Sequence, residues 1–333
     1  MDKNLIILVI HPYKNHLLKK KELNARLKGF GEKLMSLSNA HPNLRFHLVL
    51  PGYMLEGFNA IQLSKLNKMK EMGILSWITT GYTEPFITFS PQWLTGQNLA
   101  YNAELFKKLT GAQPRIYMPP FSNWEPSSIG VMKQNGMQCA VFSNELLPEE
   151  ASAYCGYWIA EHAGNPIPFF PLHTYHQYNA PVDVSGRIEK LLGQCRSGVK
   201  IITIEYLIPL VSEGKADSFK WLYDFSSALD ELLINSKMIH IDEASSYTDS
   251  LGLMNIPPGI VSCTETDGGR SLPSNYFSNY LHSFDSVAIL QRKLLNFKGD
   301  SMKNIPEKKA ARLLKELFFA QDINRYLPGR NWG

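Results

Sequence analysis

The chain has 333 residues, 44% of them hydrophobic and 19% charged, a balance that is typical of a globular protein and excludes a disordered or fibrous one. The net charge of +4 comes from scattered lysines and arginines, so we expect no nucleic-acid partner. The longest early apolar run, Leu5 to Ile10, is far shorter than the roughly 20 residues of a membrane helix, so we expect no membrane partner either.

Up to about residue 245, short apolar runs alternate with longer amphipathic stretches, as when parallel strands are joined by crossover helices. In chain order, the predicted strands are Leu5–Ile10, Phe46–Leu50, Ser76–Thr80, Arg115–Met118, Cys139–Phe142, Lys200–Ile204 and, more weakly, Met238–Ile241. The predicted helices in this part are Lys21–Leu37, Asn98–Lys108, Ser128–Asn135 and Ser218–Leu233. This alternation alone fits a barrel or a doubly wound sheet.

The character of the sequence changes after Leu251. A passage rich in Pro, Gly, Ser and Thr runs from Pro257 to Ser274, and helical patterns follow at Ser286–Leu295 and Glu307–Phe319. We therefore predict a barrel domain over residues 1–250, with a loop and helical region over residues 251–333 packed on it.

The cysteines are widely separated and form no CxxC pair, which argues against a zinc ribbon or a redox motif. The simplest interpretation is reduced thiols in a cytoplasmic protein. The four cysteines are Cys139, Cys155, Cys195 and Cys263.

Polar and aromatic residues gather just past the predicted strands, where a barrel of parallel strands builds its active face. His11 follows the first strand, Glu84 the third and Glu205 a later one. Aromatic rings beside carboxylates suit sugars, whose apolar faces stack while their hydroxyls form hydrogen bonds. The aromatic residues near these ends are Tyr82, Phe121, Trp124 and Tyr206.

Several short motifs resemble those of glycoside hydrolase family 57, in the same order along the chain. Gly81-Tyr82-Thr83-Glu84-Pro85 resembles the family's GFYEP, and Trp124-Glu125-Pro126 is similar to the WQP of its nucleophile segment TERVWQPE. His11 falls at the position of the first histidine in the family's HNHQP motif. Ser262-Cys263-Thr264-Glu265 is similar to SYFE, and Ala320-Gln321 with Tyr326 and Gly329 to the closing AQCNDAYWHG. The likeness runs from about residue 5 to residue 332.

The resemblance implies an α/β fold with a seven-stranded (β/α) barrel, similar to a TIM barrel, followed by a helical region. It also implies hydrolysis or transfer of α-glucans with retention, which needs a carboxylate nucleophile and a carboxylic acid about 5–5.5 Å apart. Counting back three residues from Trp124, however, places Phe121 at the nucleophile position. Glu205 stands where the family has its acid/base aspartate, and Glu125 is the neighbouring carboxylate that would have to replace the nucleophile.

The leading hypothesis is therefore a carbohydrate-binding protein whose retaining chemistry is lost, with an oligosaccharide or polysaccharide as partner and neither cofactor nor metal. The oligomeric state is left open. Glu205 and Glu125 are the candidate catalytic residues, and the candidate substrate-binding residues are His11, Tyr82, Glu84, Phe121, Trp124 and Glu265.

Two alternatives remain. The first is an active glycoside hydrolase or transferase with a rearranged carboxylate pair and another substrate. The second is a metal-dependent polysaccharide deacetylase that uses His173 and His176 as ligands, although these histidines are three residues apart, whereas the deacetylases' HxxxH motif spaces them by four.

Overall fold

A computed structural model of the chain describes residues 4–14, 20–85, 90–152, 154–175, 199–210, 236–256 and 306–320, and also residues 87, 189–190, 192–193, 195 and 258.

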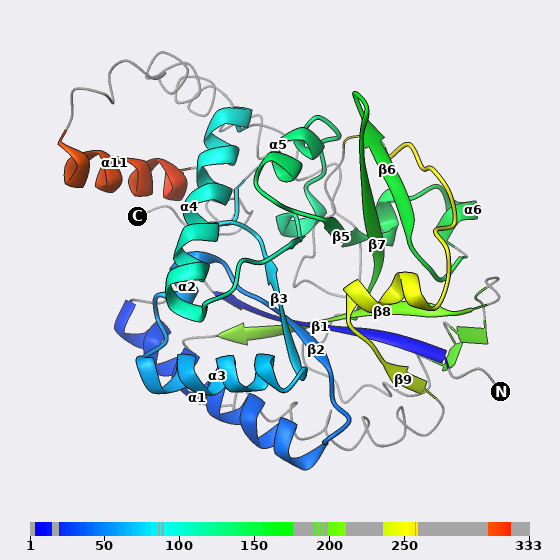
Figure 1. The fold of residues 1–333 in the computed structure, drawn as a ribbon, viewed down its shortest axis with the longest axis horizontal. Helices are drawn as coiled ribbons and strands as arrows, with labels where there is room; N and C mark the ends of the chain where they lie inside the picture. Colours follow the sequence, from blue (N-terminus) through cyan, green and yellow to red (C-terminus); the bar gives the residue numbers. More distant parts are fainter. Residues whose placement is uncertain are drawn as a thin grey trace.

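Seven parallel strands form a closed barrel (Figure 1) in the order β2-β3-β4-β5-β7-β8-β1, and the pairing of β1 with β2 closes it. They are β1 (Asn4–Lys14), β2 (Phe46–Val49), β3 (Leu75–Thr79), β4 (Ile116–Tyr117), β5 (Cys139–Ser143), β7 (Asn165–Tyr175) and β8 (Ile201–Leu210).

Helices connect the strands and cover the outside of the barrel (Figure 1). The described α-helices are α1 (Lys20–Ala40), α2 (Gly52–Leu55), α3 (Ala60–Glu71), α4 (Gln92–Thr110), α5 (Ser128–Gln134), α6 (Glu149–Ser152) and α11 (Glu307–Ala320). Short 3-10 turns lie at η2 (Pro120–Ser122), η3 (Asn144–Leu146) and η4 (Ile241–Ser246). None of the described helices is both long and apolar enough to cross a membrane. The predicted helices at 218–233 and 286–295 fall outside the described residues.

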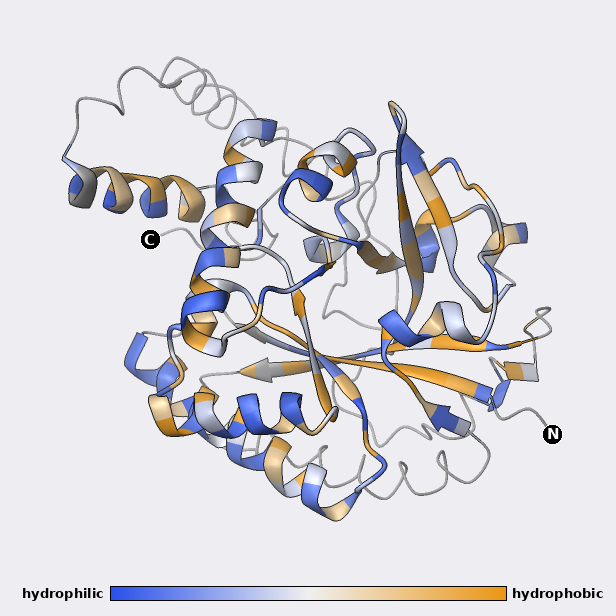
Figure 2. Cartoon of the chain, viewed as in Figure 1, coloured by the Kyte–Doolittle hydropathy of each residue, from blue (hydrophilic) through white to orange (hydrophobic). Residues whose placement is uncertain are grey.

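Two apolar layers result from the alternation of side chains along the strands. In β1, Leu5, Ile7 and Val9 join a cluster of strand residues that fills the barrel. The residues between them pack outward against Leu27 and Phe30 of α1. Figure 2 shows the barrel strands as the most apolar part of the described chain. Because both faces of these strands are buried, their sequences read as continuous apolar runs.

One barrel strand was missed by the sequence analysis. β7 pairs with β5 and β8, yet Pro166, Pro168 and Pro171 interrupt its sequence, and proline within a run argues against a strand. β6 (Trp158–His162) adds an antiparallel hairpin partner to β7. The weaker predicted strand at 238–241 corresponds to β9 (Ser236–Met238), which pairs with β1 outside the ring of seven.

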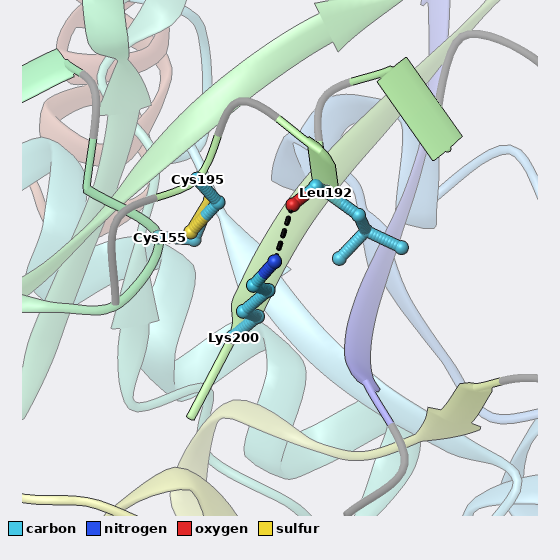
Figure 3. The surroundings of a disulfide bond; sticks show 4 residues. All are labelled: Cys155, Leu192, Cys195 and Lys200. Carbon is cyan, nitrogen blue, oxygen red and sulfur yellow. Dashed lines mark hydrogen bonds between the residues drawn. A yellow bond between two sulfur atoms is a disulfide. The ribbon is translucent and has the colours of Figure 1, made fainter. Parts of the chain in front are cut away.

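The prediction that the cysteines are all reduced is wrong for two of them. Cys155 and Cys195 form a disulfide, with their Cα atoms 5.6 Å apart across a sequence separation of 40 (Figure 3). Beside it, Lys200 Nζ donates a hydrogen bond of 2.6 Å to the Leu192 carbonyl. Cys139 is a buried free thiol, and Cys263 lies outside the described residues. Spacing did not reveal this pair because a disulfide requires proximity in space, which two distant cysteines acquire only through the fold.

The C-terminal helix α11 packs beside α4 and against the loop that follows β3 (Figure 1). Phe318 of α11 is fully buried against Tyr82 and Leu94. The Thr83 hydroxyl donates a hydrogen bond of 3.0 Å to the Phe318 carbonyl. The helix is therefore attached directly to the loop that carries Glu84, whereas the boundary near residue 250 stays a prediction.

Candidate functional site

The structure brings His11, Glu84 and Glu205 together at the carboxyl end of the barrel. His11 continues the inward series of β1 after Val9, and Glu205 lies on β8 directly opposite Val9 in the parallel register. His11 Nδ1 is 2.8 Å from Glu205 Oε1, and His11 Nε2 is 3.6 Å from Glu84 Oε1. The first contact is a hydrogen bond, and the second is an ion-pair distance. All three residues are buried.

The contacts on both ring nitrogens decide the protonation of His11. Burial by itself lowers the pKa of His11, but the hydrogen bond with Glu205 and the close contacts with both carboxylates outweigh burial and raise that pKa to about 9. The ring is therefore an imidazolium at neutral pH, with a carboxylate on each side. The two carboxylates contact different nitrogens of the same ring.

Glu84 is positioned by a loop whose backbone is fixed by side chains from α4. Gly81 has a φ of 110°, a left-handed conformation that glycine adopts without strain. Asn98 accepts a hydrogen bond of 2.6 Å from the Tyr82 backbone N–H and donates one of 2.9 Å to the Thr83 hydroxyl. Asn98 is fully buried, so these hydrogen bonds hold the loop in one conformation.

Tyr82, a candidate substrate-binding residue, points toward the C-terminal helix. Its hydroxyl donates a hydrogen bond of 3.0 Å to Glu56, and Lys315 of α11 lies 4.9 Å from its ring centroid. Lys315 also pairs with Glu56 at 2.8 Å. Tyr82 thus joins α11 to the Glu84 loop. Sequence analysis passed over Asn98, Glu56 and Lys315, because no local pattern shows that they meet.

Trp124 lies in the core. Its ring centroid is 4.7 Å from that of Phe142, and its side chain is 1% exposed, so no ring face is open to a ligand in this structure. Trp124 is therefore a core residue beneath the loop that follows β4.

The neighbours of Trp124 have local roles. The Glu125 carboxylate accepts a 3.5 Å hydrogen bond from the Ser127 backbone at the start of α5. Phe121 lies in η2 after β4, and the adjacent Ser122 hydroxyl accepts a hydrogen bond of 2.6 Å from the Ser143 backbone at the end of β5. The Phe121 side chain and Glu265 lie outside the described part of the chain.

The deacetylase hypothesis needs His173 beside a metal. His173 pairs with Ile204 in register and shares its strand face with Phe169, on the side of β7 that packs away from the barrel interior. Burial lowers the pKa of His173, so its ring is neutral. His176 lies outside the described residues, among which no group of three or more potential ligands that could hold a metal is found.

Comparisons with known proteins place the fold. No family model matches the sequence, and no curated protein matches it. The structure is similar to 4-alpha-glucanotransferase from Thermococcus litoralis, with a TM-score of 0.64 and 16% sequence identity. The match covers 90% of this chain but only 46% of that enzyme, so the chain spans about half of the enzyme's length.

Two further structures agree. The alpha-amylase AmyC from Thermotoga maritima gives a TM-score of 0.65 at 10% identity, covering 99% of this chain and 89% of that one. A GH57 branching enzyme from Thermococcus kodakaraensis, solved in complex with glucose, gives 0.66 at 11% identity, covering 98% and 85%. These similarities establish a barrel fold of the kind found in glycoside hydrolase family 57 enzymes.

Proposed function

We propose that this chain, whose barrel is similar to those of family 57 enzymes, binds carbohydrate at the carboxyl end of the barrel without retaining chemistry. The observation that carries the proposal is the His11 imidazolium between the buried carboxylates of Glu84 and Glu205. Carboxylate oxygens accept hydrogen bonds, and sugar hydroxyls are the donors that a pair of acidic side chains suits. The structural neighbour in complex with glucose supports this choice of ligand.

The position of His11 also argues against a double displacement. In a retaining enzyme the anomeric carbon sits between two carboxyl groups about 5–5.5 Å apart. Here both Glu84 and Glu205 contact the His11 imidazole. A double displacement through this pair would have to proceed with both carboxylates held by His11, or break these contacts. In the sequence, Phe121 stands at the family's nucleophile position, which leads to the same expectation that retaining chemistry is lost.

A glycan array and an assay for released reducing sugar, run on one preparation, test the proposal. We expect glycan affinity without turnover. Glu84→Gln or Glu205→Gln should weaken binding by about tenfold to a hundredfold, since hydrogen bonds to charged groups contribute roughly 1.5–3 kcal/mol. Glu104→Gln, on the exposed face of α4, is the matched control and should leave binding unchanged. Absence of any glycan binding by the folded protein would contradict the proposal.

An active enzyme with a rearranged carboxylate pair is the second candidate. The observation that favours it is the presence of two buried carboxylates at one end of the barrel, since glycosidases use such pairs. Turnover that is lost in both Glu→Gln variants, but kept in Glu104→Gln, would establish this candidate and remove the binding-only proposal.

A further inference from the structure

A cavity of about 530 Å³ opens at the amino-terminal end of the barrel. Leu75, Ile116 and Cys139, the first residues of β3, β4 and β5, line it. Glu84 follows the carboxyl end of β3, so the cavity and the proposed carbohydrate site lie at opposite ends of the strands. The volume falls within the roughly 300–1,000 Å³ that is usual for small-molecule sites.

The inner wall of this cavity is apolar. Tyr157 and Phe170 stack with their ring centroids 5.1 Å apart at 21°, beside the buried side chains of Ile116 and Ile241. Burial, with the nearby charge of Asp242, raises the pKa of the Cys139 thiol, so this group is neutral. A sugar would lose water here without gaining hydrogen bonds for its hydroxyls, which is unfavourable. The wall therefore suits a flat apolar body.

The rim of the cavity is polar, with more cations than anions. Lys70 and Arg115 are exposed, and neither forms an ion pair with any residue that the structure describes. Asp242 contributes the carboxylate at this rim. A ligand with one anionic group would gain charge-assisted hydrogen bonds from two side chains that have no competing partner among the described residues.

His240 closes one side of the lining. Its Nε2 donates a hydrogen bond of 2.9 Å to the Gly73 carbonyl, which can only accept. His240 is 7% exposed, and its Nδ1 is buried away from the open part of the cavity, so this residue is part of the wall and does not contact a ligand.

We propose that the amino-end cavity binds a small, flat, largely apolar anion. The apolar body lies against Tyr157 and Phe170, and the anionic group reaches Lys70 and Arg115. This site is independent of the proposed carbohydrate function, because it shares no residue with it.

The test uses two matched fluorescent probes. 8-Anilinonaphthalene-1-sulfonate has a flat aromatic body, an N–H donor and a sulfonate, and N-phenyl-1-naphthylamine is the same body without the charge. We expect saturable binding of both probes to the folded protein. Ser76→Phe fills the cavity, because Ser76 lines it and shares its strand face with the interior residue Ile78, so this variant should lose binding of both.

Charge variants separate the anionic part of the proposal from the apolar part. Lys70→Gln combined with Arg115→Gln should weaken the sulfonate probe by about three- to tenfold and leave the uncharged probe unchanged. Lys65→Gln with Lys68→Gln removes two exposed cations from α3 that do not line the cavity, and is the matched control.

Three results would overturn the proposal. One is unchanged probe binding in a Ser76→Phe variant whose circular dichroism and melting temperature match the parent. Another is equal loss of the sulfonate probe in both charge variants. Displacement of the probe by a maltooligosaccharide would exclude the apolar ligand class at this end of the barrel.

Discussion

His11 lies between two buried carboxylates, and its protonation links the site to the stability of the fold. Its pKa rises from 6.5 to about 9 in the folded protein. The folded state therefore keeps the His11 proton over a pH range in which the unfolded state has lost it. Such a contribution is complete below pH 6.5 and disappears as the pH rises through 9.

We predict that the stability difference between the parent and His11→Gln shrinks as the pH rises from 6.5 to 9. The rise of about 2.5 in pKa corresponds to a change on the order of 3 kcal/mol. Urea unfolding of both proteins across this pH range measures it, with the exposed His162→Gln as control. A difference that stays constant with pH would show that His11 is not held as an imidazolium.

Trp124 is a candidate sugar-binding residue whose side chain is buried in the core. We predict that Trp124→Ala lowers the free energy of unfolding by about 3–5 kcal/mol, since it removes a fully buried ring that packs on Phe142. Chemical denaturation measures this change. Trp158→Ala, at a half-buried position on β6, should cost clearly less. Similar losses for both variants would contradict the core placement of Trp124.

The loop after β3 and helix α11 are coupled although Thr83 and Phe318 are 235 residues apart. Lys315 contributes an ion pair with Glu56 and lies over the rings of Tyr82 and Tyr101. These contacts are partly exposed, so each contributes modestly. Together they tie the C-terminal helix to the loop that positions Glu84.

We predict that Lys315→Ala lowers the free energy of unfolding by about 1 kcal/mol and also weakens glycan binding, because the Glu84 loop loses part of its support. Lys309→Ala on the exposed face of α11 is the control. Denaturation and glycan titration of both variants measure the two effects. Equal behaviour of the two lysine variants would show that α11 does not support the loop.

For the molecule as a whole, the disulfide between Cys155 and Cys195 restricts the unfolded chain, because it closes a segment that contains β6 and β7. Removing it with Cys155→Ser and Cys195→Ser should lower the free energy of unfolding by about 4 kcal/mol, the loop-closure value for a separation of 40 residues. Counting thiols in the denatured protein with and without reductant verifies the bond. If all four thiols react without reductant, this assignment is wrong.

The bond also removes part of the basis for a cytoplasmic location, since disulfides persist mainly in oxidising compartments. The location itself stays a prediction.

The sequence by itself determined the alternation of strands and helices and indicated polar residues toward the carboxyl ends of the strands. Continuous apolar runs such as Leu5–Ile10 reveal buried parallel strands, because both faces of these strands need apolar side chains. His11, Glu84 and Glu205 were identified because each follows a predicted strand, and strands that run parallel bring their carboxyl ends to one side of the barrel. In the structure β1 and β8 extend further, so His11 and Glu205 lie within them. The family resemblance supplied the barrel of seven strands.

Only the tertiary structure decided which strand completes the barrel, which way side chains point and which distant residues meet. The prolines in β7 argued against a strand at this place in the sequence. Its pairing with β5 and β8 makes it part of the barrel, and the strand's own sequence does not specify these neighbours. Tyr82 and Trp124 stand beside site residues in sequence, but they contact α11 and the outer core. The physical reason is that secondary-structure propensity and the alternation of side chains act over a few neighbouring residues. The contact between His11 and Glu205 and the disulfide instead join chain segments that are far apart in sequence and that only the folded barrel brings together.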